Sequence, residues 1–357
     1  MPPGPQFVSA ARAADLVACA SVQGKLTGCQ RKDSQAPAVP LSGRQVIASG
    51  HNLTFTPKLF YEARSTMAAE HIRHWQVGSV RVTRIVELFG LVDPPGNLFI
   101  DGSPEEVKRH TWLVPHHATA QGELMISFQA FLVRSQGLNI MVDTCIGQHK
   151  TYAHEIFAQV QSQFLEDLES IGVSAAAVDR VLCTHLHPDH VGWNTQLIGT
   201  EWKPTFPNAK YLFSRAEWAH VQQAVSSSAE PLHHVLESVL PVVAAGQAEL
   251  VEPNYRLTEE ISLVPTPGHS PGHVSVHIES AGQHAVITGD VMHHPVQCAE
   301  PGWRTHFCDD HQLAQETRRK FLRTYQGRET LVIGSHFAEP TAGWILPHGD
   351  AWRFTSE

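Results

Sequence analysis

The chain has 357 residues, a mass of 39.4 kDa and a net charge of −9, from 26 Lys and Arg against 35 Asp and Glu. This acidic balance excludes a nucleic-acid-binding protein that works through a broad basic face, and no apolar run reaches the 18 or so residues of a membrane span. The six cysteines form no CxxC pair and are too dispersed for a disulfide framework, so we expect a soluble, cytoplasmic protein with reduced thiols.

The first 66 residues differ in composition from the rest of the chain. They contain seven basic and three acidic residues, six prolines and no sustained hydrophobic period. Such a composition is typical of segments that do not bury a core. We interpret 1–66 as an N-terminal extension, disordered or dispensable for the fold, and 67–357 as one folded domain.

The predicted elements begin with strands. Alternating apolar residues around Gly78-Ser79 predict a hairpin, and apolar residues at every third or fourth position from Ile156 to Ile171 predict a helix. Further strands are predicted over 125–133, 138–142, 180–183, 210–213, 261–264, 274–278, 285–288 and 331–333, with helices near 215–225 and 312–323. Strands first and then helices between strands predict an α/β protein in which helices pack outside the sheets.

Local sequence patterns add three further predictions, on a helix start, a basic run and a set of histidines. Ser214 and Glu217 have the spacing of a capping box, which predicts the start of the helix near 215–225. The basic run 317–320 is interpreted as the solvated face of the last helix. Several histidines lack a preceding strand and are interpreted as surface residues, namely His116, His117, His233, His234 and His294.

The 24 histidines prompt a search for a metal site, and a cluster of them directly follows one predicted strand in the sequence THLHPDH. Because alternate residues of an extended segment point the same way, His185 and His187 can ligate one ion. Pro188 then turns the chain, so that Asp189 and His190 can face a second ion beside the first. Imidazole and carboxylate groups are ligands that Zn²⁺ and neighbouring first-row metals accept.

Further candidate ligands follow other predicted strands. In chain order these are His269 and His273, then Asp290, then His336. Each lies just beyond an apolar strand, so one edge of the fold collects metal-binding side chains. By contrast, Cys183 lies within a strand and is interpreted as a core residue.

With these motifs, residues from about 67 to 350 resemble the metallo-β-lactamase superfamily of binuclear metallohydrolases. The motifs that carry the resemblance are THLHPDHVG, PTPGHSPGH, GDVMHHPVQ and GSHF, in the family's order. They look most like the branch that holds N-acyl-homoserine lactonases, methyl parathion hydrolase and related degradative enzymes. The resemblance implies an α/β fold of the αββα type, a sandwich of two mixed β-sheets with helices outside.

The resemblance also implies a role for each candidate residue. The first ion is held by His185, His187 and His269. The second ion is held by Asp189, His190 and His336, and Asp290 bridges both. Asp143 and His273 are implied to lie behind the ligands and orient them.

Two positions depart from the family's pattern. Cys145 stands where the family usually has glycine, and a residue with a Cβ resists the positive φ that glycine permits. His293 stands three residues after Asp290, where the lactonase branch commonly has a tyrosine that polarises the substrate carbonyl. Two interpretations of His293 are open, a catalytic hydrogen-bond donor and a residue of the pocket rim.

The resemblance implies two zinc ions per chain, with Mn, Co or Fe as alternatives, and a hydroxide bridged between them that attacks a small-molecule lactone or ester-like bond. Asp189 is then catalytic, because it orients the hydroxide and shuttles a proton. Phosphotriester hydrolysis, hydrolytic dehalogenation of an activated aromatic and iron-dependent redox chemistry are alternatives. We expect a small-molecule substrate, no nucleic-acid or membrane partner and, from the related enzymes, a homodimer.

The surroundings of the site are less defined by the sequence. Substrate specificity is expected to reside in the loops 93–122 and 292–311, since loops carry specificity on a common scaffold. Three aromatic residues stand near the metal motifs, Trp193, Trp303 and Phe337. They either wall an apolar pocket or pack in the core.

Overall fold

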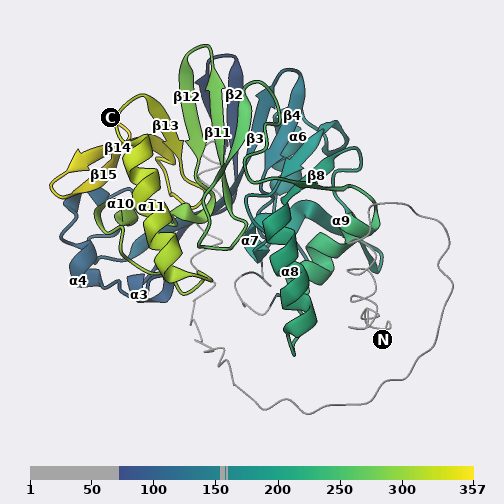
Figure 1. Cartoon of the computed structure of the whole chain (residues 1–357), viewed down its shortest axis with the longest axis horizontal. Helices are drawn as coiled ribbons and strands as arrows, with labels where there is room; N and C mark the ends of the chain where they lie inside the picture. The colour runs from purple at the N-terminus through teal and green to yellow at the C-terminus, as the bar shows by residue number, and fades with distance from the viewer. Residues whose placement is uncertain (1–71, 153–156, 158–159) are drawn as a thin grey trace.

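The computed structural model of the chain describes residues 72–152, 157 and 160–357. The predicted extension 1–66 and Ile156 lie outside the described residues. Two large β-sheets lie beside each other at the centre of the molecule, and helices cover their outer faces (Figure 1). The predicted α/β sandwich of two mixed sheets with helices outside is confirmed.

The first sheet has seven strands in the order β1-β2-β3-β4-β5-β8-β9. Its first four strands are antiparallel neighbours, and β4, β5, β8 and β9 pair in parallel, so the sheet is mixed. The strands are β1 Ile72–Val77, β2 Val80–Asp93, β3 Leu124–Ser135, β4 Leu138–Val142, β5 Arg180–Leu182, β8 Lys210–Ser214 and β9 Ala248–Val251. The predicted hairpin is present as β1 and β2, which turn at Gly78-Ser79.

The second sheet has six strands in sequential order from β10 to β15. All neighbours are antiparallel except β12 and β13, which pair in parallel. The strands are β10 Ile261–Pro265, β11 Val274–Ser280, β12 Gln283–Ile287, β13 Thr330–Ile333, β14 Ala342–His348 and β15 Ala351–Thr355. A separate hairpin consists of β6 Thr195–Ile198 and β7 Glu201–Pro204.

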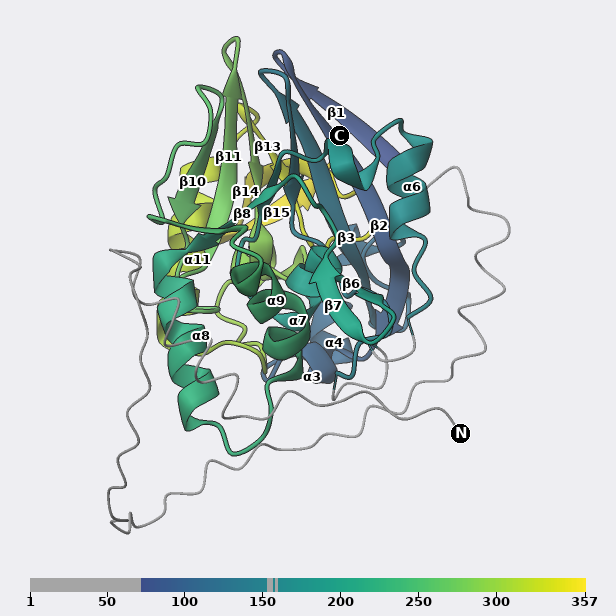
Figure 2. The same ribbon diagram turned by 90° about the vertical axis from the view of Figure 1, so that its right-hand side faces the viewer.

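Helices connect and cover the two sheets. They are α3 Pro95–Leu98, α4 Pro104–Val107, α6 Phe164–Ser170, α7 Pro188–Val191, α8 Arg215–Ser227, α9 Leu240–Ala244, α10 Val296–Ala299 and α11 His311–Tyr325, with a π-helical turn at Val235–Val239. In Figure 2, α6 lies at the right beside β2 and α8 lies at the lower left, and side chains of both helices pack against the first sheet. Within the residues that the structure describes, every helix is too short or too polar to cross a membrane.

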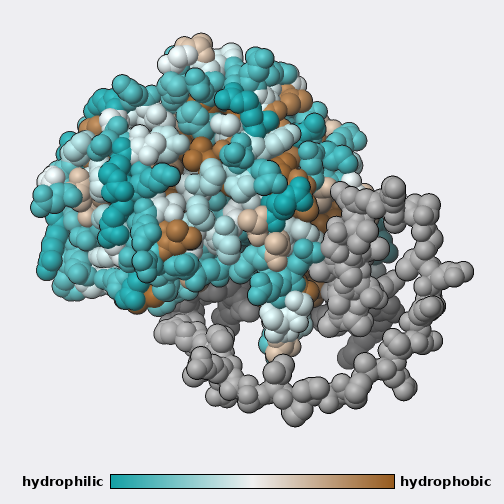
Figure 3. Space-filling model, in the orientation of Figure 1, coloured by the Kyte–Doolittle hydropathy of each residue, from teal (hydrophilic) through white to brown (hydrophobic). Residues whose placement is uncertain are grey.

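Three hydrophobic layers hold the sandwich together. Between the two sheets, Phe131 and Val133 of β3 share one buried cluster with Val276 of β11. Outside the first sheet, side chains of α6, α8 and α9 form a second cluster, and outside the second sheet α11 forms a third. Because side chains alternate along a strand, Ile287 faces the inner layer and its neighbour Val286 faces α11. The outer surface seen in Figure 3 is mostly hydrophilic.

The helix predicted from Ile156 to Ile171 is wrong in its extent, since α6 begins only at Phe164. Phe164 and Leu168 do pack on the first sheet as one helical face. Val160 lies outside the helix and packs instead against a separate small cluster of Leu91, Phe128, Ile146 and Tyr152. The apolar spacing there reflects burial in two different places and not one helical period.

Two of the histidines interpreted as surface residues are buried, so that interpretation was wrong. His294 is fully buried, and its Nε2 donates a hydrogen bond to the His117 carbonyl oxygen at 2.7 Å. The His117 ring packs edge-on against Phe337 and Phe354. Burial lowers the pKa of His294 to about 4, so it is neutral at physiological pH.

Arg318, in the run interpreted as solvated, is only 1% exposed, and that interpretation is also wrong. Its Nε donates to the Val291 carbonyl oxygen, and its Nη1 donates to the carbonyl oxygens of Pro301 and Trp303, each at 2.9 Å. One side chain of α11 therefore satisfies three carbonyls of the segment 291–303. Burial lowers the pKa of Arg318 to about 10, which leaves it charged at neutral pH.

We predict that Arg318→Met destabilises the fold by about 3 kcal/mol or more, because each of the three carbonyls loses its donor while it stays buried. The free energy of unfolding from urea denaturation checks this. Lys320→Ala, on the exposed face of the same helix, is the control and should change the stability by less than about 0.5 kcal/mol. Equal stability of Arg318→Met and the native chain would contradict the prediction.

Candidate metal centre

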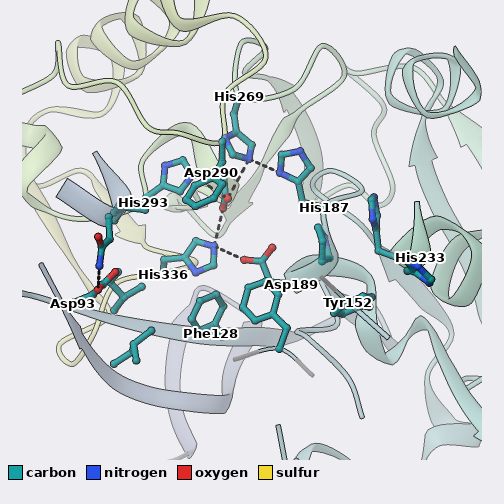
Figure 4. A pocket seen from close by; sticks show the side chains of 18 of the residues that line it. Asp93, Phe128, Tyr152, His187, Asp189, His233, His269, Asp290, His293 and His336 are labelled. Carbon is teal, nitrogen blue, oxygen red and sulfur yellow. Dashed lines mark hydrogen bonds and ion pairs between the residues drawn. The ribbon is translucent and has the colours of Figure 1, made fainter. Parts of the chain in front are cut away.

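The predicted ligands meet at one edge of the sandwich, where strands of both sheets end. His185 and His187 follow β5, and Asp189 and His190 lie in the short helix α7. His269 lies in the loop between β10 and β11, Asp290 follows β12 and His336 follows β13. Figure 4 shows His187, Asp189, His269, Asp290, His293 and His336 turned toward a common centre. Residues up to 151 positions apart in the sequence are thus brought together.

One group of donor atoms comes from His185, His187 and His269, whose side chains are largely buried. The His269 Nε2 lies 3.1 Å from the Nε2 of His185 and 2.8 Å from the Nδ1 of His187. The Asp290 Oδ2 lies 3.3 Å from the same His269 nitrogen. These nitrogens belong to three separate loop positions and face a single point.

A second group comes from Asp189, His190 and His336. The Nε2 atoms of His190 and His336 lie 3.2 Å apart, and the Asp189 Oδ2 lies 3.6 and 3.5 Å from them. Here the other oxygen of Asp290 takes part, since its Oδ1 lies 3.3 Å from His190 and 3.2 Å from His336. Asp290 therefore presents one oxygen to each group.

The donor set fits a pair of metal ions. Zinc–nitrogen bonds of about 2.0–2.1 Å place two ligand atoms of a tetrahedral site about 3.4 Å apart, and the contacts within each group are close to that separation. The Asp290 Oδ1 is buried without a hydrogen-bond partner, as are both ring nitrogens of His293. A buried carboxylate oxygen without a hydrogen-bond donor is unfavourable, and a cation beside the Asp290 Oδ1 removes that cost.

The electrostatics differ between the two donor groups. Burial lowers the pKa of His190 and His336, but nearby carboxylates, Asp290 first, outweigh it and raise the pKa of both. Burial lowers the pKa of His185 and His269 well below the usual value, so both imidazoles are neutral, as ligation requires. Burial raises the pKa of Asp290, but the surrounding histidines, His190 first, outweigh it and hold that pKa well below its usual range. Asp290 is thus ionised in the centre of the cluster.

Asp143 and His273 lie behind this cluster. The Asp143 carboxylate accepts hydrogen bonds from the Thr184 backbone N–H at 2.7 Å and from the His190 Nδ1 at 2.9 Å. The His273 Nε2 accepts the Asp290 backbone N–H at 2.7 Å, and its Nδ1 lies 3.0 Å from the Thr266 carbonyl oxygen. Both ring nitrogens of His273 are therefore engaged away from the group of ligands.

The loop after β4 keeps its shape despite the cysteine. Cys145 has a φ of 50° and Asp143 a φ of 58°, so non-glycine residues adopt the left-handed conformation here, at a cost of about 1–2 kcal/mol each. Backbone hydrogen bonds fix the loop against α7 and its continuation, from Thr144 N to His190 O and from Gly192 N to Cys145 O. A Cβ at Gly192 would lie 1.9 Å from the Ile146 carbonyl, so only glycine allows this approach.

A cavity of about 520 Å³ opens onto the metal centre. Its walls are mainly apolar, and Figure 4 shows Phe128 and Tyr152 opposite the ligands. The loops 93–122 and 292–311 both contribute, through Asp93, Asn97, Leu98, His293 and Phe307. Apart from the candidate ligands, the remaining wall comes from Leu91, Ile126, Phe128, Tyr152, Phe157, Pro188, Pro231, Leu232, His233 and His234.

Sequence reasoning missed most of this wall. Leu91, Ile126 and Phe128 lie in strands and have no signal that separates them from core residues. His233 and His234 line the cavity, although they were interpreted as surface residues, and burial lowers the pKa of His234 to about 3. The aromatics that sequence proximity suggested, Trp193, Trp303 and Phe337, pack in the core instead and do not line the cavity.

His293 lies where the metal centre meets this cavity. Its side chain is 6% exposed, and its Nε2 lies 3.3 Å from the Asp290 Oδ2. The ring stacks parallel to His336 with centroids 6.0 Å apart. Burial lowers the pKa of His293, so the ring is neutral and carries one N–H donor.

The comparison with protein families agrees with this geometry. The model of the metallo-beta-lactamase superfamily matches residues 129–336, more than half of the chain. The chain therefore belongs to the metallo-β-lactamase superfamily, as the sequence motifs predict.

Among curated proteins, the chain is similar to N-acyl homoserine lactonases. It is 25% identical to that of Bacillus cereus over 162 residues, which is 42% of this chain and 57% of the relative, and 26% identical to that of a Bacillus species over 172 residues, 44% and 61%. A lactonase of Bacillus thuringiensis is 25% identical over 48% of this chain and 66% of its own. The chain thus spans less than two thirds of the length of these relatives.

Solved structures share the fold. AidC, described as a dizinc quorum-quenching lactonase in complex with a product, has a TM-score of 0.64 at 18% identity, with 80% of this chain and 97% of that chain covered. AbOPH, described as a hydrolase in the beta-lactamase superfamily, has a TM-score of 0.65 at 22% identity with the same coverage. A probable metal-dependent hydrolase from Staphylococcus aureus gives 0.57 at 18% identity, covering 79% and 99%.

Glu87 of β2 supports the loop after β4 from behind. Its buried carboxylate accepts the backbone N–H of Ile146 at 2.6 Å and the indole N–H of Trp193 at 2.7 Å. Burial raises the pKa of Glu87 to about 7, against the opposing effect of these hydrogen bonds. The folded chain thus binds a proton on Glu87 more tightly than the unfolded chain, where the ordinary value is 4.5.

We predict that this proton makes the stability of the native chain fall as the pH rises from about 4.5 to 7, by up to about 3 kcal/mol from Glu87. In that range the folded state retains the proton and the unfolded state releases it, so raising the pH favours unfolding. Urea denaturation across this range should show a smaller fall for Glu87→Gln, which cannot titrate. Parallel curves for the two proteins would show that Glu87 does not contribute.

Proposed function

We propose that the chain is a metal-dependent hydrolase that uses two zinc ions to cleave a small-molecule lactone or ester-like bond. The observation that carries the proposal is the paired donor groups, joined by Asp290, at the floor of a mainly apolar cavity. His185, His187 and His269 would hold one ion, and Asp189, His190 and His336 the other. A bound metal pair supplies Lewis-acid polarisation of a carbonyl and a lowered pKa for water.

The residues of the chain then have distinct tasks. Asp189 is the most exposed of the ligand carboxylates, at 16%, and it lines the cavity, so its free oxygen can accept the proton of the attacking water and deliver it to the leaving oxygen. The N–H of neutral His293 donates to the carbonyl oxygen as negative charge develops there. The apolar walls hold the body of the substrate and exclude bulk water.

The lactone or ester class is favoured by the relatives that bear the name N-acyl homoserine lactonase and by the mainly apolar walls of the cavity. Phosphotriesters and activated chloroaromatics have apolar bodies as well. They are therefore the comparison substrates in the test.

The test measures metal content by elemental analysis and turnover of an acyl-homoserine lactone, an aryl ester, a phosphotriester and a chlorinated aromatic on one sample. We expect close to two zinc ions per chain and the highest turnover with the lactone or the ester. Because His187 is a proposed ligand, His187→Ala should reduce turnover by more than the roughly 10–100-fold that is typical when a residue hydrogen-bonded to a ligand is lost. The control is His116→Ala, an exposed residue.

Full zinc without turnover of the lactone or the ester would contradict the proposed substrate class. One iron per chain would contradict the zinc hydrolase and favour the redox chemistry of other superfamily members.

His293 gives a second prediction. His293→Phe keeps an aromatic ring and removes the N–H, so we expect kcat to fall about 10²–10³-fold, the usual effect of losing one oxyanion donor. His293→Tyr differs from this variant only by a hydroxyl group, and it should recover part of the activity. Metal content measured on both variants separates a catalytic role from ligation. An unchanged kcat in His293→Phe would place His293 only at the rim of the cavity.

A further inference from the structure

Glu217 is a buried carboxylate that the proposed reaction does not use. The predicted capping box of Ser214 and Glu217 is wrong, because α8 does begin at Arg215 but the Ser214 hydroxyl makes no capping bond and is itself buried without a partner. The Glu217 side chain points away from its own helix end. It is 2% exposed, and among the described residues no cation forms an ion pair with it.

The carboxylate of Glu217 binds two different loops. Its Oε1 accepts the backbone N–H of Leu186 at 3.1 Å. Its Oε2 accepts the Ser270 hydroxyl at 2.7 Å and the backbone N–H of Gly272 at 3.0 Å. Three hydrogen bonds to one buried carboxyl group, two of them from backbone N–H groups, thus connect α8 to both loops.

These two loops supply the three histidines of the first donor group. Leu186 lies between His185 and His187, and Ser270 directly follows His269. Within each loop, the position of the backbone next to a histidine determines where that histidine lies. Between the loops, the two oxygens of one carboxylate fix the relative position of the backbone at Leu186 and at Ser270.

The packing of α8 against the second loop is equally close. A Cβ added at Gly272 would lie 2.1 Å from the Glu217 backbone nitrogen and 2.5 Å from its Cα. Only glycine therefore lets the first turn of α8 approach the loop closely enough for the carboxylate to reach both loops. Ligand distances in metal sites tolerate only about ±0.2 Å, so a small separation of the loops is enough to weaken binding.

We propose that Glu217 is a positioning residue for the metal centre, whose carboxylate sets the distance between the loops that carry His185, His187 and His269. The inference rests on the proposed metal site, and it concerns ion affinity and not the choice of substrate. The second ion would be held by Asp189, His190 and His336, none of which lies in the loop that carries His269, so we expect Glu217 to act mainly on the first ion.

The test isolates each ion in the full-length chain. His336→Ala leaves only the first ion site intact, and His187→Ala leaves only the second. Zinc affinity is measured by competition with a chromophoric chelator, with and without Glu217→Gln, in each background. Gln has the size of Glu but places an amide N–H₂ against backbone donors.

We expect the dissociation constant to rise about 10–100-fold in the His336→Ala background, as for loss of other outer partners, and to change little in the His187→Ala background. The matched control is Glu230→Gln, an exposed residue just after the same helix. Gly272→Ala provides an independent route to the same separation of the loops, and it should weaken the same ion.

A role only in stability has a different signature. In that case Glu217→Gln would lower the melting temperature of the metal-free chain and leave zinc affinity unchanged in both backgrounds, which would overturn the proposal. If Glu217→Gln does not fold, Ser270→Ala takes its place, since it removes one donor and leaves both backbone contacts. It should weaken the first ion to a smaller degree, and an unchanged affinity would overturn the proposal.

These measurements use no substrate. A chain that binds two ions but turns over none of the substrates would contradict the proposed function and leave the role of Glu217 standing. If the chain hydrolyses a lactone or an ester but Glu217→Gln leaves its zinc affinity unchanged, the proposed function is supported and the proposed role of Glu217 is overturned.

Discussion

The structure depends on one electrostatic constraint: many side-chain atoms that could bind a metal ion lie close together in a buried space. Donor atoms of six histidines and two aspartates lie in overlapping groups, each spanning less than 4.8 Å. Imidazole lone pairs and carboxylate oxygens repel one another at such distances unless positive charge lies between them. Asp290 meets this constraint from the middle, because each of its two oxygens faces a different group.

Buried hydrogen bonds hold the backbone around this cluster in place. Three buried side chains, two carboxyl groups and one guanidinium, each bind backbone groups of segments near the centre. Glu87 holds the loop after β4, Glu217 holds the two histidine loops and Arg318 holds the segment that follows Asp290. Hydrogen bonds from the Arg318 guanidinium to three carbonyl oxygens are stronger than neutral ones, and they offset part of the cost of burying its charge.

The sequence predicts the parts of this arrangement that are local. The strands and the candidate ligands were predictable, because apolar runs are followed directly by histidine and aspartate, and His185 and His187 lie two residues apart. The supporting residues were not. Glu217 has the spacing of a helix cap, and Arg318 lies in a polar helical run, yet their partners are 15 to 55 positions away. Local patterns cannot distinguish a buried charged residue with distant partners from a solvated one.

The large sequence distance between residues that meet in the structure also explains why the cavity was harder to predict than the ligands. Its walls come from long strands and loops, which can vary without moving the strand ends that carry the ligands. His293 belongs to both parts. Its backbone N–H donates to the Gln297 side chain at 2.7 Å, and Arg318 fixes the adjacent Val291 carbonyl. His293 therefore occupies a rigid position three residues after Asp290. A substitution at this position therefore changes the chemical group that faces the cavity and leaves the candidate metal ligands in place.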